Sequence, residues 1–184
     1  MNFIKTAISD LIIIEPTVYG DNRGYFSESF NLKKFEENIY PIKFVQDNES
    51  KSSKGVLRGL HFQKPPFEQA KLVRCIEGRV LDVAVDIRTG SNSYGQHIAV
   101  ELSGENKKQL FIPRGFAHGF MVLSESAIFA YKVDNDYAPE YDSGIKYDDK
   151  HLNINWGLTK DKVKLSEKDL NLPPFKDLNS PFNF

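Results

Sequence analysis

The segment KLVRCIEGRVLDVAVDIRTG, residues 71–90, restricts the possible folds more than any other part of the sequence. It holds two runs of strand-favouring residues joined at Glu77-Gly78. In the second run, apolar Leu81, Val83, Val85 and Ile87 alternate with Asp82, Ala84 and Asp86. Alternation with period two is typical of a β-strand, because successive side chains point to opposite faces. The segment therefore predicts two consecutive strands.

Two later segments, HIAVELSGENKKQLFIP and GFMVLSESAIFAYKVDN, repeat this pattern, with turns predicted at Ser103-Gly104 and Ser124-Glu125. Helical periodicity appears in residues 31–39, where Asn31 can cap a helix whose apolar face holds Leu32, Phe35 and Ile39. Many short strands and few helices predict an all-β fold, an antiparallel sandwich or barrel of jelly-roll type. Such a barrel can hold one small ligand, so polar side chains at inward positions become candidates for function.

The chain of 184 residues is 40 % hydrophobic, which predicts one domain over residues 1–184. Roughly the last ten residues are rich in Pro, Asn and Phe and are expected to form a surface tail. With 24 basic and 25 acidic residues the net charge is -1, so we expect neither a nucleic acid nor a membrane as partner. The N-terminal apolar stretch is too short to span a bilayer. The chain has a single cysteine, Cys75, so an internal disulfide is impossible and a location in the reducing cytoplasm is expected. We expect Cys75 itself to be packed in the core.

The stretch GVLRGLHFQKPP places Arg58 and His61 in one predicted strand. Residues an odd number apart point to opposite faces, unless Gly59 marks a bulge that redirects one of them. Taken alone, His61 is better interpreted as a hydrogen-bonded interior residue than as a catalytic one.

The stretch FIPRGFAHGF holds Pro113, Gly115 and His118 in a P-x-G-x-x-H spacing, which resembles the second motif of the cupin barrels. In metal-binding cupins the first motif supplies two histidines as H-x-H. Here the corresponding place holds His61, Phe62 and Gln63, so the pair is broken. We therefore expect no metal.

Two further clusters leave structural and functional interpretations open. In FAYKVDNDYAPEYDSG, Tyr131, Tyr137 and Tyr141 lie near acidic residues, but tyrosines in strands mostly serve packing. In KLSEKDLNLP, the Ser166-x-x-Asp169 spacing is equally compatible with a helix-capping box and with catalysis.

Taken together, seven segments resemble the dTDP-4-dehydrorhamnose 3,5-epimerases in order and spacing, from about Phe3 to Asp169: GDNRGYFSESF, FVQDNES, GVLRGLHFQ, QAKLVRCIEGRVLDVAVDIR, FIPRGFAHGF, YKVDNDYAPEYDSGI and LSEKD. The resemblance implies a cupin-like jelly-roll barrel that forms a homodimer. It also implies an isomerase that needs no cofactor and inverts C3 and C5 of a dTDP-linked 4-keto-6-deoxyhexose. A related 3-epimerase or ketoisomerase is the alternative, and a non-enzymatic sugar-nucleotide binder or a metal cupin is a third possibility.

The resemblance also implies roles for single residues. A proton beside a ketone can be removed if a cation meets the enolate oxygen, and inversion needs a base and an acid on opposite faces of the sugar. By matching motifs, His61 is the base, Asp169 its carboxylate partner, Tyr131 the acid and Lys71 the enolate stabiliser. The implied substrate contacts are Arg23, Glu28, Gln46, Asn48, Arg58, Lys71, His118, Tyr137, Asp142 and Lys168.

Two of these contacts carry further implications. In the family the region of Arg23 reaches toward the partner subunit's site, so dimerisation would be part of the active site. Tyr137 resembles the aromatic residue that stacks on the nucleotide base. Relatives often have glutamate where this chain has Asp142.

Overall fold

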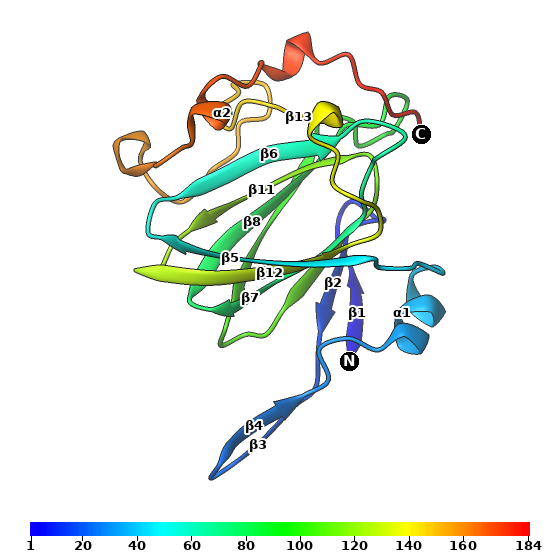
Figure 1. The fold of residues 1–184 in the computed structure, drawn as a ribbon, viewed down its shortest axis with the longest axis vertical. Helices are drawn as coiled ribbons and strands as arrows, with labels where there is room; N and C mark the ends of the chain where they lie inside the picture. The colour runs from blue at the N-terminus through cyan, green and yellow to red at the C-terminus, as the bar shows by residue number, and fades with distance from the viewer.

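Two antiparallel β-sheets face each other in the computed structural model, which describes residues 1–184 (Figure 1). The first six strands are β1 (Asn2–Lys5), β2 (Ile12–Glu15), β3 (Val18–Asp21), β4 (Gly24–Ser27), β5 (Gln46–Ser53) and β6 (Leu57–Gln63). The others are β7 (Lys71–Glu77), β8 (Arg79–Asp86), β9 (His97–Ser103), β10 (Gln109–Ile112), β11 (Phe116–Val122), β12 (Ser126–Val133) and β13 (Asp142–Gly144). The α-helices are α1 (Leu32–Asn38) and α2 (Glu167–Leu170), and single turns of 3-10 helix cover residues 139–141, 160–162 and 175–177.

From β5 onward, consecutive strands lie in different sheets, except for β8 and β9, which are neighbours in one sheet. One sheet has the order β1-β2-β10-β7-β12-β5, the other β13-β6-β11-β8-β9, and β3 and β4 form a separate hairpin. The two predicted runs are β7 and β8, and the chain passes between the sheets at Gly78. Gly78 has a φ of +78°, and a Cβ atom there would lie 2.1 Å from the Ser126 carbonyl oxygen. Only glycine can occupy this crossing without a steric clash. The strand arrangement as a whole confirms the predicted all-β antiparallel architecture.

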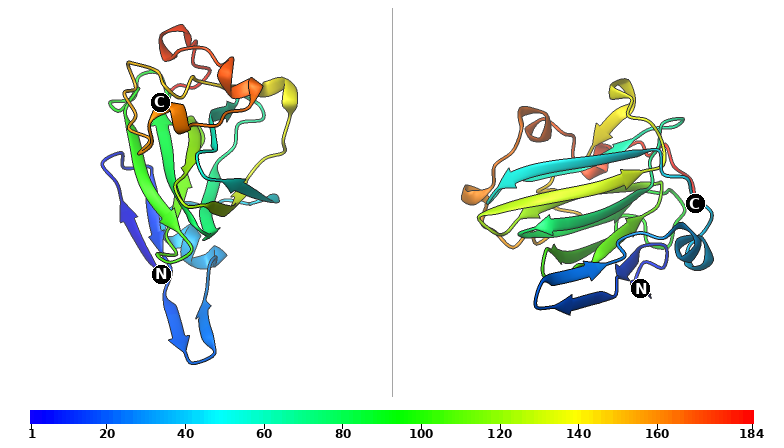
Figure 2. Two further views of the ribbon diagram at one scale, coloured as in Figure 1. Left: turned by 90° about the vertical axis from the view of Figure 1, so that its left-hand side faces the viewer. Right: turned by 60° about the horizontal axis from the view of Figure 1, so that its bottom comes forward.

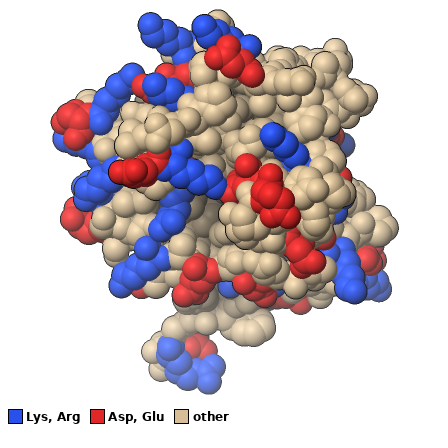
Figure 3. Space-filling model, turned by 45° about the horizontal axis from the view of Figure 1, so that its top comes forward, with Lys and Arg blue, Asp and Glu red and all other residues tan.

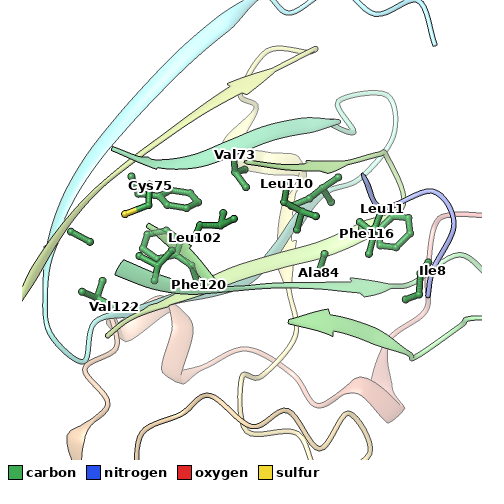
Figure 4. Close-up of a cluster of buried hydrophobic side chains, with 14 residues drawn as sticks. Ile8, Leu11, Val73, Cys75, Ala84, Leu102, Leu110, Phe116, Phe120 and Val122 are labelled. Atoms are coloured by element: carbon green, nitrogen blue, oxygen red, sulfur yellow. The ribbon is translucent and has the colours of Figure 1, made fainter. Parts of the chain in front are cut away.

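Apolar side chains fill the space between the sheets and also cover the outer face of the five-stranded sheet. Figure 4 shows the inner cluster, in which Val73 and Leu110 of one sheet pack against Phe120 and Leu102 of the other. Cys75 belongs to this cluster, so its predicted burial is confirmed. A second cluster packs Leu60, Val83 and Val85 beneath the C-terminal segment. The five-stranded sheet is therefore buried on both faces.

The helix predicted at residues 31–39 is confirmed as α1. The Asn31 side chain caps it by accepting a hydrogen bond from the Lys34 backbone N–H at 3.2 Å. Phe35 is fully buried, with its ring 5.1 Å from that of Phe111. Leu32 departs from the predicted apolar face, because its side chain is 48 % exposed and is not part of the cluster that buries Phe35.

The β3–β4 hairpin projects away from the two sheets, as Figures 1 and 2 show. Its large side chains are exposed, with Tyr19 at 64 % and Phe26 at 69 %. Lys107 from the main body donates a hydrogen bond to the Tyr25 hydroxyl at 2.8 Å. A projecting hairpin with exposed aromatic residues is typical of an interaction surface.

The C-terminal segment lies along the outer face of the five-stranded sheet (Figure 1). Phe182 packs into the second cluster, with its ring 5.9 Å from that of Phe62. Backbone hydrogen bonds join Thr89 to Phe182 and to Phe184, and the Arg88 guanidinium lies over the Phe184 ring. The tail is therefore fixed in place by several contacts.

The buried carboxylate of Asp86 anchors this end of the barrel. It accepts hydrogen bonds from Arg88 Nη2 at 2.7 Å, Ser91 Oγ at 2.6 Å and Ser93 Oγ at 2.7 Å. Burial alone would raise the pKa of Asp86, but these donors lower it to about 2. The carboxylate is therefore expected to stabilise the fold at every pH above its unfolded pKa.

The pKa of Asp86 in the folded protein lies below the unfolded value of about 3.9. We therefore expect the Asp86 network to contribute about 2 kcal/mol to the free energy of unfolding, and this contribution should be lost as the pH falls from about 4 to 2. Denaturant unfolding of the wild type and Asp86→Asn at pH 6 and pH 2 measures this. The stability gap between the two should shrink at pH 2. A gap that does not change with pH would contradict the assignment, and Asp47→Asn, at an exposed position, serves as the control.

Charged side chains of both signs are mixed over the face shown in Figure 3. No helix in the structure combines the length and the apolar character needed to span a membrane.

Candidate active site

A pocket of about 580 Å³ opens between the two sheets. Its lining includes eight of the residues predicted from the sequence: Asn48, Arg58, His61, Lys71, His118, Tyr131, Lys168 and Asp169. A neighbouring pocket of about 270 Å³ shares four of them and adds Gln46, Tyr137 and Asp142. The barrel thus brings together predicted residues from segments up to about 120 positions apart in the sequence.

A bulge in β6 lets Arg58 and His61 share one face. His61 pairs with His118 of β11 and Arg58 with Phe120, so β6 advances three residues where β11 advances two. The extra residue lies at the Gly59 position, where a Cβ atom would come within 2.5 Å of the Gly119 Cα atom. Bulges redirect side chains in this way, so the interpretation of Gly59 as a bulge is confirmed.

His61 and Asp169 form a close pair, with the Nε2 atom 2.5 Å from Oδ1. Ser166 caps α2 by accepting a hydrogen bond from the Asp169 backbone N–H, and its hydroxyl donates to Asp169 Oδ2 at 2.6 Å. Burial would raise the pKa of Asp169, but the hydrogen bonds from His61 and Ser166 hold it below its ordinary value. The Ser166-x-x-Asp169 motif is thus a helix cap that also orients the carboxylate toward the histidine.

Tyr131 and Lys71 enter the pocket from the opposite sheet. They lie on the adjacent strands β12 and β7, in the register that pairs Tyr131 with Val73 and Val133 with Lys71. Burial raises the pKa of Tyr131 above its ordinary value, with Arg58 opposing the shift. Burial lowers the pKa of Lys71, and the carboxylates of Asp142 and Asp82 oppose that shift.

The smaller pocket holds a second set of polar contacts. The Tyr137 hydroxyl donates to Asp142 Oδ2 at 3.0 Å, and Lys168 forms an ion pair with the same oxygen. The Gln46 amide donates to Asn48 Oδ1 at 2.7 Å. Tyr137 is 55 % exposed, so its ring is free to stack on a planar ligand.

Gln63 occupies the place where metal-binding cupins carry the second histidine of H-x-H. Its amide donates to the carbonyls of Phe67 and Asp136 and accepts from the Ala138 N–H. This side chain therefore fixes the loop that follows β12. The structure contains no group of three or more His, Cys, Asp or Glu side chains arranged to hold a metal ion.

Arg23 and Glu28 lie outside both pockets in the single chain. Arg23 is at the tip of the β3–β4 hairpin, with its side chain 85 % exposed and paired with Asp21. Glu28 pairs with Lys34 at 2.7 Å.

Two polar residues near the site were not predicted from the sequence. Asp82 is completely buried, and its Oδ2 atom lies 2.9 Å from His118 Nε2. Ser52 accepts a hydrogen bond from Arg58 Nε at 3.3 Å. The only signal for Asp82 was its place in the alternating run of β8, opposite the apolar residues.

An antiparallel barrel whose interior pocket joins a histidine-aspartate pair to a lysine and a tyrosine defines a cupin-like jelly roll equipped for acid-base chemistry. Residues 5–177 match the model of the family described as dTDP-4-dehydrorhamnose 3,5-epimerase. The chain belongs to this family.

Individual relatives match over nearly the whole chain. The dTDP-4-dehydrorhamnose 3,5-epimerase of Shigella flexneri is 55 % identical over 178 residues, covering 96 % of this chain and 97 % of its own. The crystal structure of the Elizabethkingia anophelis enzyme is 56 % identical with a TM-score of 0.92, covering 97 % of this chain and 98 % of its own. The structure of dTDP-6-deoxy-D-glucose-3,5-epimerase from Legionella pneumophila in complex with dTDP-4-keto-L-rhamnose is 50 % identical with a TM-score of 0.95, covering 100 % of this chain and 98 % of its own.

Proposed function

We propose that this protein is an isomerase that converts dTDP-4-dehydro-6-deoxy-D-glucose to dTDP-4-dehydro-L-rhamnose by inverting C3 and C5, a step of dTDP-L-rhamnose biosynthesis. One observation carries the proposal. The His61-Asp169 pair reaches the pocket from one side, while Tyr131 and Lys71 reach it from the six-stranded sheet opposite. A sugar held between them meets a base on one face and an acid on the other.

Proton removal is the first step. The hydrogens on C3 and C5 are acidic because both carbons adjoin the C4 ketone, so the electron pair left behind moves onto the ketone oxygen. His61 takes the proton, and Asp169 fixes the imidazole and stabilises its charged form. The Lys71 ammonium stabilises the enolate oxygen.

Reprotonation from the other face completes each inversion. Tyr131 gives its hydroxyl proton to the carbon as the enolate returns to the ketone. Because burial raises the pKa of Tyr131, the hydroxyl keeps its proton until the enolate forms. The same groups serve C3 and C5, since both carbons flank the ketone.

The remaining side chains suit a nucleoside diphosphate. The Arg58 guanidinium, held by Ser52, offers a forked donor for phosphate oxygens, and Lys168 and His118 lie along the same pocket. The exposed Tyr137 ring can stack on the thymine base. Gln46, Asn48 and Asp142 supply hydrogen-bonding groups between these positions.

We propose a homodimer in which the β3–β4 hairpin of one subunit packs against the other. The exposed aromatic residues of the hairpin and the position of Arg23 outside both pockets support this arrangement. Arg23 and Glu28 would then complete the partner's site. The free, buried Cys75 and the near-neutral charge fit a cytoplasmic enzyme with no nucleic acid or membrane as partner.

Proton NMR of dTDP-4-keto-6-deoxy-D-glucose with the pure protein in deuterated water tests the function, with EDTA present and no nicotinamide added. We expect deuterium at both C3 and C5 and unchanged activity with EDTA, with the L-lyxo product confirmed by adding a reductase. Exchange at C3 alone would identify the related 3-epimerase. Absence of exchange at both carbons would refute the proposed reaction, and loss on chelation with recovery on adding a metal would refute the metal-free mechanism.

A further inference from the structure

Three segments that are distant in the sequence meet at the carboxylate of Asp142. Asp142 is the first residue of β13, and its partner in the β-ladder is Gln63 of β6. Tyr137, on the loop that follows β12, donates a hydrogen bond from its hydroxyl to Asp142 Oδ2 at 3.0 Å. Lys168 of α2 forms an ion pair with the same oxygen. A single carboxylate oxygen therefore joins a strand, a loop and a helix.

The carboxylate and its two partners differ in burial. The Asp142 side chain is only 10 % exposed, whereas the Lys168 side chain is 50 % exposed and Tyr137 is 55 % exposed. A carboxylate with so little solvent contact needs protein donors, so both partners are held against it. Long exposed side chains are otherwise mobile, and ordering them when a ligand binds costs affinity. Asp142 removes this cost before the ligand arrives.

No other carboxylate competes for these two donors. Asp169, the neighbour of Lys168 in α2, is occupied by hydrogen bonds with the proposed catalytic histidine and the helix cap. Glu49, which also lines the main pocket, is exposed on β5 and shares no salt bridge with Lys168. Asp142 is therefore the acidic group that determines where both side chains lie.

We propose that Asp142 is a positioning residue that holds Tyr137 and Lys168 together as a preformed clamp for the nucleoside diphosphate. The inference deepens the proposed function and rests on it. Tyr137 offers its ring to the base, and Lys168 offers its ammonium group to the diphosphate. Because one oxygen fixes both side chains, binding of the base and binding of the diphosphate are coupled through Asp142.

The sign of the effect separates positioning from simple electrostatics. A carboxylate beside a bound diphosphate repels it and also occupies Lys168, so loss of the charge alone would strengthen binding. Loss of a preformed clamp weakens binding instead, because the ligand must then order two side chains. Removal of the Asp142 carboxylate thus has opposite outcomes under the two explanations.

Calorimetric titration with dTDP tests the inference, because binding is measured without turnover. Asp142→Ala removes both contacts and should weaken dTDP binding about tenfold. Tyr137→Phe keeps the ring and every charge in the pocket and removes only the hydroxyl that reaches Asp142, so it should weaken binding about threefold. The double variant should bind dTDP as Asp142→Ala does, because the hydroxyl has no role once its acceptor is gone.

Asp136→Ala is the matched control, because it removes an exposed carboxylate of the same loop that takes no part in the Asp142 contacts. It should leave dTDP binding unchanged. Unchanged or tighter binding by Asp142→Ala would overturn the inference. An equal loss in Asp136→Ala, or effects that add in the double variant, would overturn it as well.

The binding readout also separates this inference from the proposed reaction. If the wild type binds dTDP but leaves the keto sugar unchanged, the proposed reaction fails, and a tenfold loss in Asp142→Ala still supports the clamp. If the wild type turns over the keto sugar and Asp142→Ala binds dTDP normally, the reaction stands and the inference is overturned.

Tyr137→Phe decides the matter if Asp142→Ala does not fold, because the exposed ring can lose its hydroxyl without disturbing the core. Weaker dTDP binding in Tyr137→Phe would then support the inference, and unchanged binding would overturn it.

Discussion

Replacing His61 with asparagine is expected to lower turnover by roughly a thousandfold, because the substitution removes the only group paired with Asp169 that can accept the C3 and C5 protons. Deuterium exchange at both carbons should fall by the same factor, since proton removal precedes every later step. The fold should persist, because asparagine can still donate to the Asp169 carboxylate. Steady-state kinetics, NMR exchange and thermal unfolding measure the three quantities.

His97→Asn is the matched control for this experiment. His97 lies on β9, outside both pockets, so its replacement should leave turnover unchanged. Full exchange in His61→Asn would show that another residue removes the protons, and the histidine-aspartate mechanism would then be wrong.

The Tyr131→Phe variant separates proton removal from inversion. Loss of the hydroxyl removes the proposed acid but leaves His61 and Lys71 in place, so deuterium should still enter the substrate from the His61 face. Formation of the inverted product should fall about a hundredfold or more. Substrate that is deuterated but not inverted is therefore the expected result, read by NMR and by coupling to a reductase.

Tyr94→Phe provides the control, because the Tyr94 ring packs against that of Phe175 and lies outside both pockets. The pH dependence offers a second check on Tyr131. Burial raises its pKa, so the phenol remains protonated beyond the ordinary titration range of tyrosine, and the alkaline limb set by this group should lie above pH 10. Normal inversion by Tyr131→Phe would assign the acid to another group.

The sequence predicted those features that depend on local pattern or on long matching motifs. Strand alternation predicted β7 and β8, and the capping signal predicted α1. The odd spacing of Arg58 and His61 raised the question of a bulge, which only the pairing of β6 with β11 could answer. The register between strands depends on contacts distant in sequence, so local pattern does not determine it.

Asp82 shows where alternation misleads. A period-two pattern indicates which residues share a face, but it does not reveal whether the other face meets solvent. In β8 the apolar face packs under the C-terminal segment, and Asp82 lies on the face toward the barrel interior. The polar side of the strand is therefore the side next to the pocket. The β3–β4 hairpin was likewise not predicted, because its strands are exposed and carry no buried apolar face.

The short helix α2 makes the His61-Asp169 pair depend on the C-terminal segment being folded onto the barrel. Asp169 reaches His61 across 108 positions of sequence, and it arrives only after the C-terminal segment has returned to the edge of β6. A chain whose C-terminal segment is detached would lack both the Asp169 partner of His61 and the side of the pocket that Ser166 and Lys168 line. Activity that depends on the His61-Asp169 pair therefore requires the C-terminal segment to be in place as well as the barrel.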